Sequence, residues 1–234
     1  PEVERLTLGR VHLKILSNLA AHRLARVEAT FTPKELSNDG TEENGNQIIQ
    51  GILEAHHFAL ADPFRAATHN KGVMNAISSV AVACGQDWRA IEAGCHSWAS
   101  FSNDNYSSMT EWKLNDEGCL VGSIETPMAV GIVGGASKVH PVAKTNLAIL
   151  GVTSASELAG IICAAGLAQN LGALRALATN GIQAGHMKLH SRNMAVSAGA
   201  LGEEIEIVAT KLQSHIGPKT QTIVQKILDE IRES

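Results

Sequence analysis

The sequence predicts an α+β fold: a large domain built around one long central helix with strands and surrounding helices, followed by a small all-helical C-terminal flap. Residues 153–179 carry the longest helical pattern in the chain and are rich in Ala and Gly. Several short segments alternate apolar and polar residues with the period of a β-strand. The C-terminal segment divides into amphipathic helical pieces. Separate segments with strand periods, combined with helical periods in the rest of the chain, favour the α+β class.

Four segments are expected to form strands. Residues 9–18 and 23–31 each place apolar side chains at alternate positions, which predicts two half-buried strands. Residues 107–114 and 119–126 flank the turn-rich tetrapeptide NDEG, and they therefore predict a β-hairpin.

Helices are expected in most of the remaining chain. After a polar loop at 37–46, a helical stripe starts at Gln47 and runs towards Pro63, where the proline ring should interrupt it. The long helix at 153–179 opens on TSASE, which has the pattern of a capping box. Three amphipathic helices are expected near the C-terminus, at residues 182–198, 202–214 and 218–232.

Composition limits the classes of partner. The chain has 234 residues and a formal net charge of −4, and its Lys and Arg residues follow no stripe, so no nucleic-acid partner is expected. The most apolar stretch, residues 158–168, is too short to span a bilayer, so no membrane is expected. Four cysteines without a CxxC pair indicate reduced thiols. Without a visible signal peptide, they predict a cytoplasmic protein.

Two segments gather residues suited to catalysis. Residues 62–75 hold Arg65, Lys71 and Asn75, and Asp87 stands where a helix is expected to start. A cation can polarise a carbonyl oxygen and a carboxylate can tune that cation, a combination that suits the reduction of an activated carbonyl. The structural alternative makes Lys71 a surface ammonium and Asp87 a helix N-cap.

A Gly-rich loop and a pair of histidines complete the candidates. Residues 130–141 lead into a helical pattern but match neither GxGxxG nor the Walker sequence, so phosphate binding and a tight turn both stay open. His186 and His190 have the spacing of an HExxH zinc site, yet Met187 stands where that motif requires Glu. No metal site is therefore expected, and the histidines are either an acid and a base or two exposed side chains.

Four literal motifs carry a family resemblance. They are ATHNKGVMN (67–75), GQDWRAIEAG (85–94), VGGASKVHP (133–141) and GLAQNLGALRALATNGIQAGHMKLHSRN (166–193). Together they closely resemble the class II, bacterial type of hydroxymethylglutaryl-coenzyme A reductase. The match runs from about residue 9 to the helical C-terminus, with the motifs in the order of the family.

The resemblance implies an NAD(P)H-dependent oxidoreductase of the mevalonate pathway. Hydroxymethylglutaryl-coenzyme A would take two hydrides from NADH or NADPH, pass through a hemithioacetal and mevaldehyde, and leave as mevalonate and coenzyme A. Lys71 would stabilise the thioester oxyanion, Asp87 would hydrogen-bond with Lys71 and keep it charged, and His186 would protonate the departing thiolate. The matched substrate contacts are Arg65, Asn75, Ala173, Leu177 and His190, and Asn18 matches a position near the nicotinamide carboxamide.

The resemblance also implies the domain organisation. Residues 1–20 would be the terminal strand of an otherwise missing cofactor-binding small domain, residues 21–180 the large catalytic domain, and residues 181–234 the flap. The family's ENVIG segment, which carries the catalytic glutamate, and its DAMGAN segment do not occur, so the chain corresponds to the C-terminal half. Gln86, where the family usually has Asn, and Ser191, where it often has Ala, are mild departures. Because the family builds each active site between two subunits, a homodimer or higher homo-oligomer is expected.

Two alternatives stay open at this stage. The chain is either catalytic or a non-catalytic fragment that binds an acyl-coenzyme A or assembles with a partner chain. Intact Lys71, Asp87 and His186 favour catalysis, since a scaffold has no need for that combination. The same groups would serve the reverse reaction, the oxidation of mevalonate. The choice between NADH and NADPH depends on residues of the absent small domain.

Overall fold

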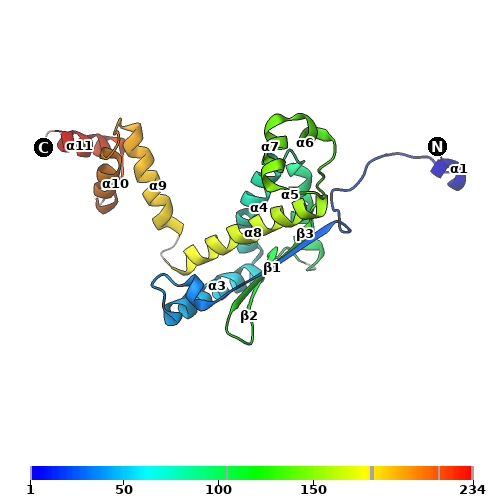
Figure 1. Cartoon of the computed structure of the whole chain (residues 1–234), viewed down its shortest axis with the longest axis horizontal. Helices are drawn as coiled ribbons and strands as arrows, with labels where there is room; N and C mark the ends of the chain where they lie inside the picture. Colours follow the sequence, from blue (N-terminus) through cyan, green and yellow to red (C-terminus); the bar gives the residue numbers. More distant parts are fainter. Residues whose placement is uncertain (1, 104, 180–181, 216, 233–234) are drawn as a thin grey trace. The chain divides into compact units, whose positions relative to one another are not determined.

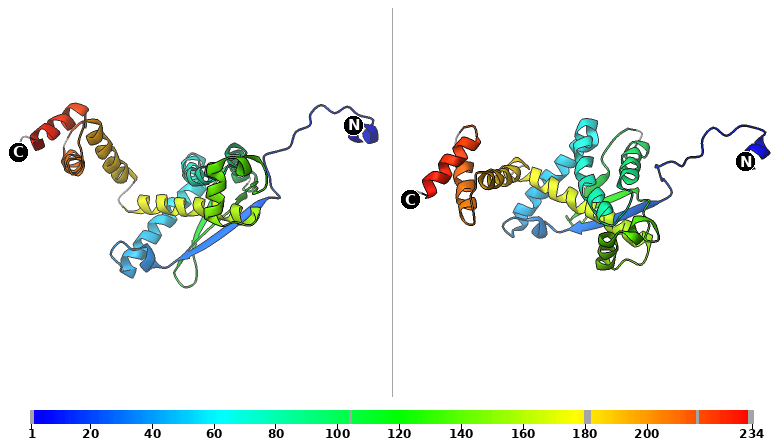
Figure 2. Two further views of the ribbon diagram at one scale, coloured as in Figure 1. Left: turned by 45° about the horizontal axis from the view of Figure 1, so that its top comes forward. Right: turned by 90° about the horizontal axis from the view of Figure 1, so that it is seen from above.

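A computed structural model describes residues 2–103, 105–179, 182–215 and 217–232, apart from the side chains of residues 138 and 182–189. It confirms the α+β class, because it combines helices with a three-stranded antiparallel sheet (Figures 1 and 2). The chain divides into two compact units, Pro1–Arg175 and Ala176–Ser234.

The first unit contains the sheet and most of the helices, and the end of its last helix continues into the second unit. In chain order its elements are α1 (Glu2–Thr7), β1 (Leu24–Phe31), α2 (Pro33–Leu36), α3 (Glu42–Ala61), α4 (Pro63–Ala83), α5 (Trp88–Phe101), β2 (Thr110–Leu114), β3 (Leu120–Pro127), α6 (Gly135–Val139), α7 (Pro141–Leu150) and α8 (Ala155–Ala178).

The sheet is antiparallel, with the strand order β1-β3-β2. β1 pairs with β3 over its whole length, so that Val27 lies opposite Ile124. β2 pairs with the other edge of β3, so that Trp112 lies opposite Gly122. The indole ring of Trp112 occupies the space that a Cβ atom at Gly122 would need. The strand predicted at 23–31 and the predicted hairpin are both confirmed.

The strand predicted at residues 9–18 is wrong. This segment has no regular structure and pairs with no described strand, and its Leu13 and Ile15 side chains are 80% and 85% exposed. Alternation of apolar residues is not sufficient for a strand, because the backbone N–H and C=O groups also need a partner.

Helices α3 and α4 follow one another with a sharp break. Thr41 caps α3 by accepting a hydrogen bond from the Asn44 amide at 3.2 Å, so the helix begins earlier than predicted and the polar loop is shorter. Asp62 ends α3 and caps α4. Pro63 takes the first position of α4, where its missing N–H leaves no helical bond unmade. The predicted interruption at Pro63 is confirmed.

Helix α8 is the predicted central helix, and its capped start is also confirmed. The Ser154 hydroxyl accepts a hydrogen bond from the Glu157 amide at 3.1 Å. Gly166 lets the helix approach α4 closely, because a Cβ atom there would lie 2.8 Å from the side chain of Ile77. The helix therefore packs against α4 through a contact that a larger residue would open.

The length of α8 corrects the sequence estimate of the longest apolar segment. Over an 18-residue window its mean hydropathy is 1.4, so by length and composition alone it could cross a membrane. The apolar segment is longer than the predicted residues 158–168, because Ala and Gly residues continue it beyond this range. A core helix meets the same criterion, and Leu158, Ile162 and Leu174 are buried inside the first unit.

The described helices of the second unit are α9 (Ile182–Ser197), α10 (Glu204–Ser214) and α11 (Gln221–Arg232), which confirms the three predicted helices. Arg232 joins the end of α11 to the start of α10 through hydrogen bonds to the Glu204 carboxylate at 2.9 and 2.8 Å. The unit has its own apolar core, made by Ala195, Ala200, Val208, Leu212, Val224, Ile227 and Leu228.

Candidate functional site

Helices α4 and α5 form an antiparallel hairpin that carries Lys71 and Asp87. A short turn joins the helices, and the Ser78 hydroxyl of α4 donates to the Glu92 carboxylate of α5 at 3.3 Å. This bond marks the register of the two helices. The middle of α4 therefore lies beside the end of α5, and the start of α5 lies beside the end of α4.

Lys71 is exposed in the middle of α4, whereas the two residues before it are buried. Asn70 donates from Nδ2 to the Ser107 carbonyl at 2.8 Å and accepts a hydrogen bond from the Met109 amide at 2.9 Å. These bonds tie α4 to the segment that enters β2. The backbone at Lys71 is thus fixed from the buried side, while the ammonium faces solvent.

His69 lies at the centre of a buried polar cluster on the opposite side of α4 from solvent. Its Nε2 is 2.9 Å from the hydroxyls of Ser108 and Thr110 and 3.1 Å from Nδ2 of Asn170. Oδ1 of Asn170 accepts hydrogen bonds from the Thr110 hydroxyl at 3.0 Å and from the Trp112 indole at 2.8 Å. Burial lowers the pKa of His69 to about 3, so its ring is neutral at pH 7. The cluster joins α4, α8 and β2.

His56 of α3 extends this cluster. Its Nε2 accepts a hydrogen bond from the Trp112 amide at 3.3 Å, and its ring centroid lies 6.2 Å from that of His69. Burial lowers the pKa of His56 to about 4. Sequence analysis assigned this network no role. The available signal was that polar side chains occupy positions of α3 and α4 where the helical period requires burial.

The predicted substrate contacts lie on two helices. Asn75 follows Lys71 by one turn of α4, so the two side chains share a face. Arg65 is half-buried nearer the start of the same helix. Ala173 and Leu177 are likewise one turn apart on α8; Ala173 is half-buried and Leu177 is 39% exposed. Each set is therefore presented by a regular helix rather than by a loop.

Asp87 is the N-cap of α5, which confirms its structural role. Its carboxylate accepts a hydrogen bond from the Ala90 amide at 3.2 Å and lies 3.9 Å from the Arg89 guanidinium, and its side chain is 62% exposed. Lys71 precedes Ala83, the last residue of α4, by about 18 Å along the helix axis at ~1.5 Å per residue. The described residues of one chain therefore do not form the predicted contact between Lys71 and Asp87.

The Gly-rich segment 130–141 leads into a helix, as predicted. Gly134 and Gly135 have φ angles of 85° and 56°, which glycine adopts without strain. The helix that follows, α6, is only five residues long and has no side-chain cap at Gly134. The local geometry is that of a tight turn packed against the connection between α4 and α5.

The other predicted residues lie elsewhere. Asn18 is exposed, and its backbone carbonyl packs on Gly94 of α5, where a Cβ atom would lie 2.7 Å from the carbonyl oxygen. His190 is exposed on α9 in the second unit. His186 belongs to the same helix, but its side chain lies outside the described residues.

The cysteines agree with the expectation of reduced thiols. All four are free, and Cys84, Cys95 and Cys163 are buried. Burial raises the pKa of Cys95 to about 11 and that of Cys163 to about 12. These thiols are protonated at pH 7 and act as small apolar side chains.

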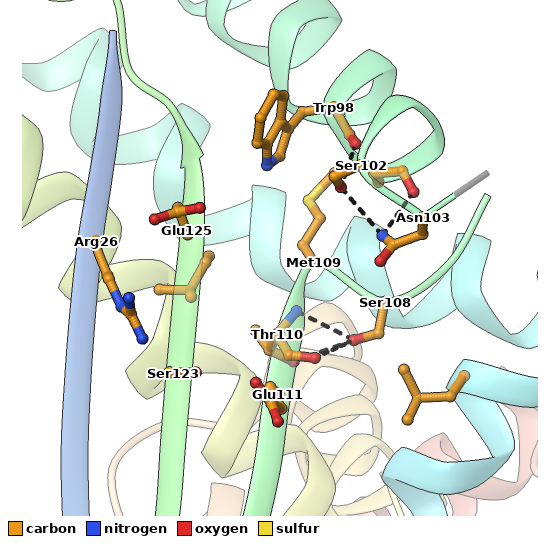
Figure 3. A pocket seen from close by; sticks show the side chains of 13 residues that line it. Arg26, Trp98, Ser102, Asn103, Ser108, Met109, Thr110, Glu111, Ser123 and Glu125 are labelled. Carbon is orange, nitrogen blue, oxygen red and sulfur yellow. Dashed lines mark hydrogen bonds between the residues drawn. The ribbon is translucent and has the colours of Figure 1, made fainter. Parts of the chain in front are cut away.

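A surface cavity of about 470 Å³ lies between the outer face of the sheet and α5 (Figure 3). Arg26 and Glu125 line it on the sheet side, and Trp98 and Met109 line it on the other. None of the predicted site residues contributes to its lining. The cavity is therefore separate from the surface that carries Lys71.

Comparison with known proteins matches residues 1–191 to the family model described as hydroxymethylglutaryl-coenzyme A reductase. The chain is 50% identical to the 3-hydroxy-3-methylglutaryl-coenzyme A reductase of Archaeoglobus fulgidus over 232 residues, which are 99% of this chain and 51% of that protein. It is 39% identical over 178 residues to a probable reductase of the same name from Borreliella burgdorferi, covering 76% of this chain and 40% of that protein.

Comparison with solved structures also finds reductases of this family. The class II reductase of Streptococcus pneumoniae, described as bound to NADPH in open conformations, is 40% identical with a TM-score of 0.72, over 99% of this chain and 55% of that one. A second structure of the S. pneumoniae reductase is 39% identical with a TM-score of 0.73, and the match covers 99% of this chain and 54% of that one.

Fold and motifs thus define an α+β domain of the kind found in a family of reductases. More particularly, the chain belongs to the hydroxymethylglutaryl-coenzyme A reductase family, so the class II resemblance carried by the four motifs is confirmed. It spans about half the length of the curated relatives that it matches.

Proposed function

We propose that this chain forms the large domain and flap of a class II enzyme that reduces hydroxymethylglutaryl-coenzyme A to mevalonate and coenzyme A with NADH or NADPH. An N-terminal half would supply the catalytic glutamate and the small domain, and residues 1–20 would complete that domain. The observation that carries the proposal is the exposed Lys71, on a helix that His69 and Asn70 fix from the buried side.

The chain's own residues suit each binding task. As the thioester carbonyl is reduced, negative charge develops on its oxygen, and the Lys71 ammonium would stabilise that charge. The Arg65 guanidinium would bind the free carboxylate of the substrate through paired donors. Asn75, on the same face of α4 as Lys71, would hydrogen-bond with the acyl part, and Ala173 and Leu177 would offer it an apolar contact. Coenzyme A and mevalonate follow as product partners.

The cofactor would be held mainly outside this chain. When bound, a nicotinamide supplies the hydride. Asn18 fits a carboxamide partner, because its backbone is anchored on Gly94 while its amide side chain is exposed and of a type that can make paired hydrogen bonds. The S. pneumoniae relative described as bound to NADPH supports the use of a nicotinamide cofactor.

A second copy of the chain would complete the site. Lys71 lies about 18 Å, along the axis of α4, from the end of that helix, and Asp87 follows in the turn beyond that end. A lysine side chain bridges only about a third of that distance. Asp87 of one subunit could therefore keep Lys71 charged only across an interface, as in a homodimer with two equivalent sites.

The second unit would act as a closing flap. His186, on α9, would protonate the departing thiolate of coenzyme A, and His190, one turn further along, would contact the acyl group. Such a flap excludes water during the reaction and opens to release products. The buried, protonated thiols Cys95 and Cys163 support a reducing, cytoplasmic setting, and we expect no membrane or nucleic-acid partner.

The test is a chimera in which the N-terminal half of the A. fulgidus reductase precedes this chain. We expect NADPH or NADH oxidation when hydroxymethylglutaryl-coenzyme A is added, and a loss of about a thousandfold in kcat with Lys71→Met. Lys34→Met, a change of an exposed lysine on α2, is the matched control and should leave kcat unchanged.

Two outcomes would overturn the proposal. Binding of the substrate without any turnover in either direction would identify the chain as a non-catalytic fragment. Full activity of the Lys71→Met chimera would remove the lysine from the mechanism. Mevalonate with NAD⁺ and coenzyme A should be turned over by the same protein, because the same groups serve both directions.

A further inference from the structure

The turn between α4 and α5 is held by the side chain of Gln86. Its Nε2 donates to the Gly131 carbonyl and to the Cys84 carbonyl, each at 2.9 Å. Its Oε1 accepts a hydrogen bond from the Gly131 amide, also at 2.9 Å. Both donors of the amide and one acceptor are therefore used on backbone groups. Gln86 thus exchanges two hydrogen bonds with the backbone of Gly131, one in each direction, as two paired residues of neighbouring strands do.

The surroundings of the turn leave it little freedom. Gly85 has a φ angle of 69°, and a Cβ atom there would lie 3.0 Å from Cβ of Ala143 and 3.1 Å from the Ser137 amide nitrogen. Asn146 of α7 donates from Nδ2 to the Ala83 carbonyl at 2.7 Å. The segment that contains α6 and α7 therefore packs directly on the turn.

Asp87 follows Gln86 and lacks comparable support of its own. Among the described residues its carboxylate contacts only its own helix, through the Ala90 amide and the exposed Arg89 side chain. The direction of the carboxylate therefore depends on the turn that carries it. We propose that Gln86 is a positioning residue for Asp87, because its clamp on Gly131 holds the carboxylate where a Lys71 of a second copy can meet it. This inference rests on the proposed reductase function.

The experiment measures the pH–rate profile of the chimera with Gln86→Met, which has a similar length and makes no hydrogen bonds. We expect kcat to fall about tenfold or more, since a misplacement of about 1 Å at a catalytic group costs up to about a hundredfold. We also expect the alkaline limb of the profile to move to lower pH, because Lys71 loses a nearby negative charge. Substrate KM should change less than about twofold, since Gln86 would not touch the substrate.

Gln86→Glu can keep one of the three hydrogen bonds, the one donated by the Gly131 amide. This variant replaces Gln86→Met in the experiment if Gln86→Met does not fold. Gln47→Met, on the exposed side of α3, is the matched control and should leave kcat and the pH limb unchanged. A Gln86 variant with lower thermal stability but the kcat and pH limb of the parent would overturn the positioning role. If Asp87→Asn itself leaves the parent's activity unchanged, the proposed function of Asp87 fails instead, so the two failures are distinguishable.

Discussion

The two ends of the α4–α5 hairpin support their charged residues in different ways. At Lys71 the support is a buried side-chain network, in which His69 and Asn170 join three elements through hydrogen bonds. At Asp87 the support is an exposed turn, clamped by one amide side chain to a backbone segment. The difference teaches that loss of the buried network should strongly lower the stability of the fold, whereas loss of the exposed clamp should mainly impair the chemistry.

The largest effect is expected from Asn170→Ala, which breaks the buried end. The change removes the acceptor that the Trp112 indole uses among the described residues, and it takes one hydrogen bond each from the Thr110 hydroxyl and the His69 ring. Each buried group left unsatisfied costs about 1–3 kcal/mol, so the free energy of unfolding should fall by about 3 kcal/mol or more. Urea unfolding followed by circular dichroism measures this.

The neighbouring change Gln169→Ala is the control for that experiment. Gln169 is exposed on the same helix and should alter the free energy of unfolding by less than about 0.5 kcal/mol. Equal effects of the two substitutions would show that the polar cluster does not stabilise the fold.

The pH dependence of stability sharpens the comparison, because only the buried end contains titrating histidines with lowered pKa values. His56 and His69 have pKa values of about 4 and about 3 in the folded protein, against 6.5 for an unperturbed histidine. Below pH 6.5 these two histidines become protonated in the unfolded chain, whereas they stay mostly neutral in the folded protein. Stability should therefore fall as the pH falls from 6.5 towards 4, by up to about 1.4 kcal/mol per pH unit for each histidine.

Urea midpoints measured between pH 7 and pH 4.5 test this linkage. His56→Gln should reduce the slope, because one of the two histidines then no longer titrates. His22→Gln changes an exposed histidine outside the cluster and should leave the slope as it is. A slope that His56→Gln does not alter would contradict the assignment.

The smallest effect on stability is expected at the exposed end. Asp87→Ala removes the N-cap of α5 and should lower the free energy of unfolding by about 1 kcal/mol, whereas Asp87→Asn, which also caps well, should be nearly neutral. Thermal unfolding of both variants measures the difference. A loss at Asp87→Asn as large as at Asn170→Ala would abolish the distinction between the two ends.

Much of the fold could be predicted from the sequence because its signals are local. The strand at 23–31, the hairpin around NDEG and the central helix each have a period and a cap or turn of their own. Residues 9–18 have the strand period but no partner strand among the described residues, and no property of the segment itself reveals that absence. The loop before α3 was overestimated because one threonine, Thr41, starts the helix early.

The candidate site was predicted residue by residue, but its geometry was not. The motifs identify Lys71 and Asp87, yet only the register of α4 against α5 shows that one chain keeps them apart. The polar network around His69 likewise depends on contacts between α4, α8 and β2, which are far apart in the sequence. The role of Gln86 depends on Gly131, a residue that the sequence places well beyond the turn.

The central claim is that two copies of the chain build one reductase site. Its most direct test mixes chimeras that carry Lys71→Met with chimeras that carry Asp87→Asn, each inactive alone. Random mixing makes about half of the dimers mixed, each with one intact site, so the account predicts about a quarter of the activity of the parent. Activity that stays at the level of the separate variants would show that Lys71 and Asp87 act within one subunit or not at all.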